Sequence, residues 1–160
     1  MAVVTFWTDE VKPSDVFGNN AQTALNGYER ESFTITVPAG KTVRVGTLLK
    51  LDYTAKTATI AAVPADAAAV TALGDVGVFV GRDLPVNPAV AADFSRLTLK
   101  STGKGVAVVK GDGSAAIYKG YLETDGTLFY DLPAAVQAAL AAKLTKENRF
   151  KVLDQVKPTL

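Results

Sequence analysis

Between Phe33 and Tyr130 the chain consists largely of short apolar stretches that alternate with polar residues and end at turns containing glycine. Phe33, Ile35 and Val37 alternate with hydroxyl-bearing residues, which is the two-residue period of a half-buried strand. The segment 76–81 is apolar throughout, as expected for a strand buried on both faces. This pattern predicts a mainly β, α+β fold whose body is a small β-barrel or is β-sandwich-like.

Turn signals divide this body further. The segment 52–56 predicts a hairpin loop, and the Asp125-Gly126 pair predicts a tight turn because both residues tolerate positive φ. Residues 97–100 and 106–110 flank a short polar segment, which predicts a second hairpin. The alanine-rich segment 65–73 fits either a short helix or a loop.

One helix is expected near the C-terminal end. Asp131 is a candidate N-cap, and Pro133 is tolerated in a first helical turn. A strand is expected to follow at about 150–153. The helix should dock one face on the body, because its large apolar side chains recur every four residues, at Leu132, Val136, Leu140 and Leu144.

Residues 1–32 are expected to form an extended N-terminal arm, and residues 33–160 a β-rich domain. The arm begins with a β-prone run that ends in two large aromatic side chains, and polar residues and turn signals follow. Such a segment can add a strand to a partner's sheet, or it can fold back on its own body or on a sister subunit. The residues we expect to make this contact are Val3, Val4, Thr5, Phe6 and Trp7.

Charge and hydropathy exclude several classes of protein. The net charge of +1 lacks the basic excess that non-specific nucleic-acid binding requires, and no apolar run approaches the length of a membrane span. We therefore expect neither nucleic acid nor membrane as a partner. Residues 1–32 carry five acidic and two basic side chains, whereas residues 100–160 carry nine basic and six acidic ones. These two regions can meet each other or a partner.

The chain contains no histidine and no cysteine, which removes the usual proton shuttle, the thiolate nucleophile and the zinc ligands. A binding or structural role is therefore expected, with no catalytic residue, no cofactor and no metal. Carboxylate pairs for glycoside hydrolysis are the remaining catalytic alternative, at Asp125 with Asp131 or Asp112 with Glu123. Asp-Gly turns account for Asp112 and Asp125, and a helix cap accounts for Asp131.

Two further chemistries have candidate residues. A serine and a lysine could act as nucleophile and base, at Ser114 with Lys119 or Ser101 with Lys104, but no supporting motif surrounds them. A carbohydrate-binding β-module of the adhesin type is the main alternative function. Its sugar platform would consist of Tyr118, Tyr121 and Tyr130.

The order of four segments resembles that in the bacteriophage head decoration proteins of the lambda type, also called capsid cement proteins. The first segment, 37–51, contains Pro-Ala-Gly and Gly-Thr-Leu-Leu, and the second is the strand 76–83. The third, 106–118, contains Val-Val-Lys-Gly, and the fourth is the alanine-rich helix 132–144. The resemblance covers about residues 33–156, and the chain is longer than the smallest members of the family.

The resemblance implies a non-enzymatic virion protein, made in the host cytoplasm, that binds the outer surface of the expanded head. There it would stabilise the shell against internal DNA pressure, usually as a homotrimer, with a dimer as the alternative. Its partners would be the major capsid protein and other copies of itself. The N-terminal arm, residues Val3 to Trp7 above all, would pair with a strand of the capsid protein.

Overall fold

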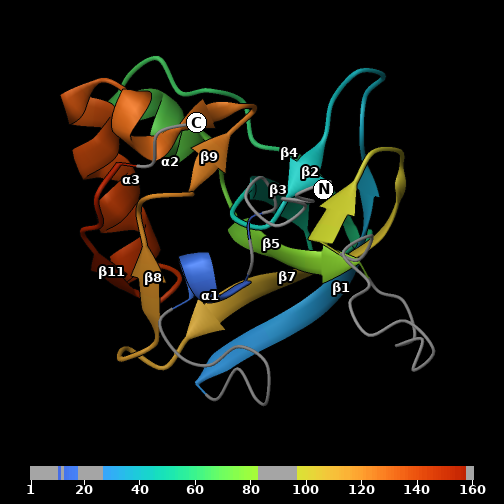
Figure 1. Cartoon of the computed structure of the whole chain (residues 1–160), viewed down its shortest axis with the longest axis horizontal. Helices are drawn as coiled ribbons and strands as arrows, with labels where there is room; N and C mark the ends of the chain where they lie inside the picture. Colours follow the sequence, from blue (N-terminus) through green and yellow to red (C-terminus); the bar gives the residue numbers. More distant parts are fainter. Residues whose placement is uncertain (1–10, 12, 18–26, 83–96, 158–160) are drawn as a thin grey trace, which may run out of the picture.

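The centre of the molecule is a closed barrel of five strands. The computed structural model describes residues 11, 13–17, 27–82 and 97–157. In the barrel β1 and β4 run parallel, whereas the other neighbouring strands run antiparallel. The expected mainly β fold with a small barrel is therefore confirmed (Figure 1). The strand order around the barrel is β1 (Tyr28–Thr36), β4 (Thr57–Ile60), β3 (Leu48–Asp52), β5 (Val76–Arg82) and β7 (Gly103–Gly111).

The alternating pattern places one face of each strand inside the barrel. Phe33 and Ile35 of β1 and Phe79 of β5 fill this interior and are almost completely buried. The opposite faces of β3, β5 and β7 are also buried, because Leu48, Val78 and Val108 belong to a second apolar cluster outside the barrel. Burial on both faces explains why the sequence of β5 is a continuous apolar run.

Two helices cover this outer face. The segment 65–73 forms helix α2 (Ala67–Ala72), where the Asp66 carboxylate accepts a hydrogen bond of 2.8 Å from the Ala69 backbone N–H as an N-cap. Helix α3 (Ala134–Lys146) packs against α2 (Figure 1), and its buried side chains share the outer apolar cluster with Leu48, Val78 and Val108 of the barrel strands. Three of its predicted apolar positions, Val136, Leu140 and Leu144, are fully buried, and each contributes roughly 1.5–3 kcal/mol of burial free energy.

The expected capping role of Asp131 is wrong. Helix α3 has Pro133 at its N-cap, without a side-chain hydrogen bond, and Asp131 lies in a separate 3-10 turn, η2 (Phe129–Asp131). Between them Leu132 is extended, with a ψ of 154°. A residue before proline avoids the helical conformation, and this separates the 3-10 turn from the helix. The Asp131 carboxylate forms an ion pair with Lys157.

The expected hairpin between 97–100 and 106–110 is also wrong. Strand β6 (Thr98–Leu99) pairs with β2 (Val43–Arg44) instead. Barrel closure explains the difference, because β7 has β1 on one edge and β5 on the other. No edge of β7 remains for β6.

Other local expectations are confirmed. The segment 52–56 connects the β3–β4 hairpin, and β11 (Lys151–Leu153) forms the expected late strand, parallel to β8 (Ala116–Tyr118). Asp125 and Gly126 have φ values of 45° and 83° in the turn between β9 (Glu123–Thr124) and β10 (Thr127–Leu128). Among the described residues, no helix has the length and apolar character needed to cross a membrane.

The barrel begins earlier than the sequence analysis expected. Strand β1 starts at Tyr28 rather than Phe33, and helix α1 (Pro13–Val16) precedes it. Val11, Val16 and Phe17 are buried in the outer apolar cluster. The described part of residues 1–32 therefore contributes to the body. The sequence analysis places the start of β1 too late because charged residues at its beginning conceal the alternating pattern.

Candidate functional site

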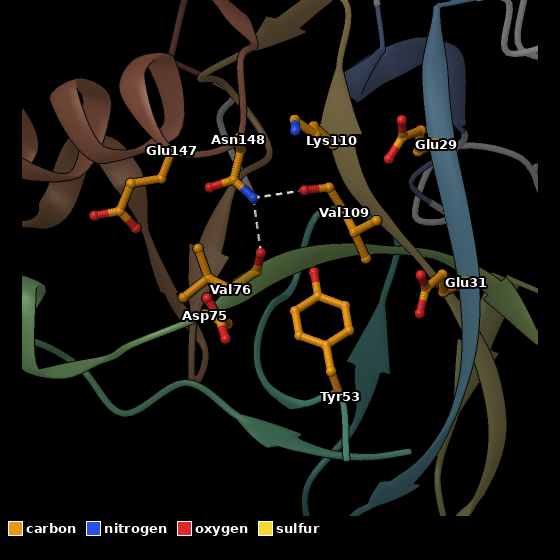
Figure 2. A pocket seen from close by; sticks show the side chains of 9 residues that line it. All are labelled: Glu29, Glu31, Tyr53, Asp75, Val76, Val109, Lys110, Glu147 and Asn148. Atoms are coloured by element: carbon orange, nitrogen blue, oxygen red, sulfur yellow. Dashed lines mark hydrogen bonds between the residues drawn. The ribbon is translucent and has the colours of Figure 1, made fainter. Parts of the chain in front are cut away.

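One end of the barrel holds a pocket of about 310 Å³. Strands β1 and β5 begin at this end, and β3 and β7 finish there, as the registers show. The open end of a small barrel is a common place for a ligand site. We call this pocket the barrel mouth; it is lined by Glu29, Glu31, Tyr53, Asp75, Val76, Val109, Lys110, Glu147 and Asn148 (Figure 2).

A β-bulge shapes the barrel mouth. Glu29 of β1 lies opposite Lys110 of β7, but Arg30 lies opposite Val108, so Val109 has no partner on β1. Bulges bend a strand and redirect its side chains, and they are frequent at barrel rims. Here the extra residue belongs to the lining of the pocket.

Asn148, just after helix α3, closes a gap between two barrel strands. Its side-chain Nδ2 donates hydrogen bonds of 2.8 Å to the carbonyl oxygens of Val76 and Val109 (Figure 2). The pairing of β5 with β7 starts only at Val78, so the amide replaces strand-to-strand hydrogen bonds at this end. Because both amide hydrogens are used, the orientation of the side chain is set. Its Oδ1 is buried and has no hydrogen-bond partner in the part of the chain that the structure describes.

Four carboxylates and one lysine surround the barrel mouth. Glu31 pairs with Lys56 at 2.8 Å, and Glu147 pairs at 2.6 Å with Lys143, whose side chain is only 6% exposed. No residue in the described ranges forms an ion pair with Glu29 or Asp75. The lining therefore carries an excess of negative charge, part of it without a counter-ion.

The negative charge of the lining affects the ionisation of Tyr53. Partial burial, together with the nearby carboxylates of Asp75, Glu31 and Glu29, raises the pKa of Tyr53 above its ordinary value. The ring packs edge-on against Phe33, with 5.8 Å between the ring centroids. Its hydroxyl points toward Val76 and Val109, with Glu31 to one side (Figure 2).

The barrel mouth is suited to holding a positively charged group. No set of three or more metal-binding side chains comes together in the described ranges. The pocket is lined by carboxylates that lie apart, and these can each accept a hydrogen bond from a positively charged donor.

The acids named as catalytic alternatives do not line this pocket. Asp125 pairs with Lys41 at 2.7 Å, and Asp112 accepts hydrogen bonds from the Ser114 and Ala115 backbone N–H groups in its turn. These bonds, with the Ser114 backbone first, lower the pKa of Asp112. Glu123 is buried and hydrogen-bonded to Arg44.

The other residues named in the sequence analysis bond to neighbouring side chains, lie away from the pocket, or fall outside the described residues. Ser114 donates a hydrogen bond of 2.8 Å to Asp112, whereas Lys119 pairs with Asp154. Neither Ser101 nor Lys104 lines the barrel mouth. The three tyrosines expected to form a sugar platform, Tyr118, Tyr121 and Tyr130, are all half-buried. The expected arm contact, Val3, Val4, Thr5, Phe6 and Trp7, lies outside the described residues.

Sequence reasoning missed the barrel mouth. A signal existed for Glu31, because it continues the two-residue period of Phe33 and Ile35 toward the start of β1. No comparable signal marked Asp75 or Asn148, which come from turns remote in sequence.

Comparisons of this chain with models of known protein families, with curated proteins and with solved structures find no match.

Proposed function

We propose that this protein is a bacteriophage head decoration protein of the lambda type. It binds the outer surface of the expanded head, as a homotrimer in contact with the major capsid protein, and stabilises the shell against internal DNA pressure. It catalyses no reaction and needs no cofactor.

One observation carries the proposal: three of the four segments that resemble the family are neighbours in space. Segment 37–51 ends in β3, the described part of segment 76–83 is β5, and segment 106–118 includes most of β7. These three strands are consecutive in the barrel, in the order β3, β5, β7. Short similarities that occur in order and also form one continuous part of a sheet support a common architecture better than the same pieces scattered over the molecule would.

The use of the remaining reactive side chains supports a non-enzymatic role. Asp112 and Asp125 hold turns, Asp131 forms an ion pair, and Glu123 is buried beside Arg44. Each has a structural partner in the described part of the chain. Strength in a decorated shell arises instead from many weak, identical contacts across the lattice.

Co-sedimentation with expanded, empty heads of the phage that encodes the chain tests the proposal. The full chain should bind saturably, and it should bind less well to unexpanded heads. A chain lacking residues 2–9 should lose binding while its circular dichroism spectrum and melting temperature stay unchanged, because these residues are expected to pair with the capsid protein. A matched variant, Trp7→Ala with Phe6→Ala, should weaken binding without shortening the chain.

Absence of binding by the full chain would overturn the proposal, and unchanged binding by the truncated chain would overturn the role of the arm. Glycan-array binding by a chain that ignores heads would favour the carbohydrate-binding alternative. The mass in solution, measured by light scattering, should be three times the 16.7 kDa of one chain.

A further inference from the structure

We propose that the barrel mouth is a binding site for an alkylammonium group, either the side chain of a lysine or a free aliphatic diamine. This inference does not rest on the proposed function, since it is drawn from the lining of the pocket alone. The two sources share one chemistry, a compact cation on a flexible apolar stem.

The negative charge around the pocket favours binding of a cation. Of the four carboxylates in the lining, two are paired, Glu31 with Lys56 and Glu147 with Lys143. The other two, Glu29 and Asp75, have no ion-pair partner in the described ranges, and the lining contains one lysine, Lys110. Helix α3, 13 residues long, ends at this pocket, with Glu147 and Asn148 directly after it. The C-terminal end of a helix carries partial negative charge, which adds to the attraction for a positive group.

A buried acceptor provides independent evidence for a ligand that donates hydrogen bonds. Asn148 is 5% exposed, and its Oδ1 has no hydrogen-bond partner among the described residues although both hydrogens of Nδ2 are bonded. Buried polar atoms nearly always have a partner, so one without a partner at a pocket wall requires an explanation. Figure 2 shows this oxygen turned toward Glu147, on the side of the pocket away from Val109.

An ammonium group matches these acceptors. It has three donors and no acceptor, whereas the lining offers carboxylates, the Asn148 amide oxygen and the Tyr53 hydroxyl. The aliphatic stem of the ligand can lie on Val76 and Val109. The volume of about 310 Å³ is at the small end of ligand pockets, which suits one side chain or a short diamine.

Solution NMR of the full chain tests the site, with two cations and one neutral ligand. The probes are Nα-acetyl-lysine methylamide, putrescine, and Nα,Nε-diacetyl-lysine methylamide, which has the same stem without the charge. Each is added up to about 10 mM, which is tenfold above a millimolar Kd. At least one cation should shift the Asn148 side-chain amide signals and the backbone signals of residues 29, 31, 53 and 75. The neutral ligand should shift none of them.

Charge-neutral variants test which carboxylates act. Glu29→Gln and Asp75→Asn should each weaken binding several-fold, and together at least tenfold. Both side chains belong to exposed residues, so the fold should survive, as the rest of the spectrum will report. Asp154→Asn is the matched control, since its carboxylate is 86% exposed and lies outside the pocket. It should leave the affinity unchanged.

The possible outcomes distinguish the two ligand sources from each other and from a failure of the proposal. Tighter binding of the lysine analogue supports a protein side chain, and tighter binding of putrescine supports a free diamine. No localised shift with either cation, equal shifts with the neutral ligand, or equal affinity of the double variant and the Asp154→Asn control would each overturn the proposal. None of these results would alter binding of the chain to heads through its arm.

Discussion

Two nitrogens of Arg44, Nε and Nη2, donate hydrogen bonds to the same carboxylate oxygen of Glu123, at 2.9 and 2.6 Å. The second oxygen of Glu123 accepts a bond of 2.7 Å from the Thr47 hydroxyl. The Glu123 side chain is 3% exposed, whereas the Arg44 side chain is 32% exposed. This ion pair joins β2 to β9, two short strands that belong to different small sheets.

Arg44→Met should therefore destabilise the fold strongly. Removal of one partner from a buried ion pair leaves an uncompensated charge, at a cost of about 3 kcal/mol. The exposed ion pair between Lys41 and Asp125 gives the control, since Lys41→Met should cost less than about 1 kcal/mol. Urea unfolding of both variants measures the difference, and equal losses would contradict the assignment.

Asn148→Ala should lower the free energy of unfolding by about 1–3 kcal/mol, because two buried carbonyl groups lose their donor. Asn148→Asp has nearly the same shape but places a carboxylate against the same two carbonyls, so its loss should be larger. Amide hydrogen exchange should become faster first at the start of β5 and at the end of β7, where Asn148 is bound. An Asn148→Asp variant as stable as the parent would disprove the bridging role.

Gly105→Ala should destabilise the barrel by about 1–3 kcal/mol through overpacking. A Cβ at this position would lie 2.5 Å from Cδ1 of Ile35 and 2.7 Å from Cε2 of Phe79, both inside the barrel. The matched control is Gly103→Ala on the same strand, where the nearest atom would be 3.5 Å away. Thermal unfolding should distinguish the two variants, and a tolerated Gly105→Ala would show that the interior is loosely packed.

Tyr53 should ionise at a higher pH than an ordinary tyrosine. Burial and the carboxylates of Asp75, Glu31 and Glu29 favour the neutral phenol in the folded state. The pKa of Tyr53 is therefore higher in the folded state than in the unfolded state. The contribution of Tyr53 to the free energy of unfolding is fully present below the unfolded pKa near 10, and it is lost as the pH rises through the folded pKa.

Ultraviolet absorbance at alkaline pH, with Tyr53→Phe to identify the signal, measures this shift. Asp75→Asn should move the pKa of Tyr53 back toward its ordinary value. Ligand cations that enter the barrel mouth should lower it as well. An unchanged titration in the Asp75→Asn variant would mean that the Asp75 carboxylate does not contribute to the raised pKa of Tyr53.

Local patterns predicted most elements of the fold. Phe33 and Ile35 lie inside a strand, Leu140 and Leu144 lie on the buried face of a helix, and Asp125 lies in a turn, as expected. These features depend on residues that are near each other in the chain, so periodicity and turn chemistry suffice to find them. The start of β1 was set too late because Glu29 and Glu31 interrupt the apolar pattern.

Strand partners and the barrel mouth were not predictable in this way. Strand β6 lies just before β7 in the sequence, yet closure of the barrel occupies both edges of β7 and leaves β6 to pair with β2. The cap assigned to Asp131 failed because the extended Leu132 before Pro133 separates it from the helix.

The amino-acid sequence by itself determined where strands, turns and the long helix form, because each depends on side chains a few residues apart. Only the tertiary structure decided which strands are neighbours and which acids share a pocket. The barrel mouth combines residues from 29 to 148, brought together by closure of the sheet and by the docking of helix α3. Hydrogen bonding between remote strand edges governs that closure, and no local pattern encodes it.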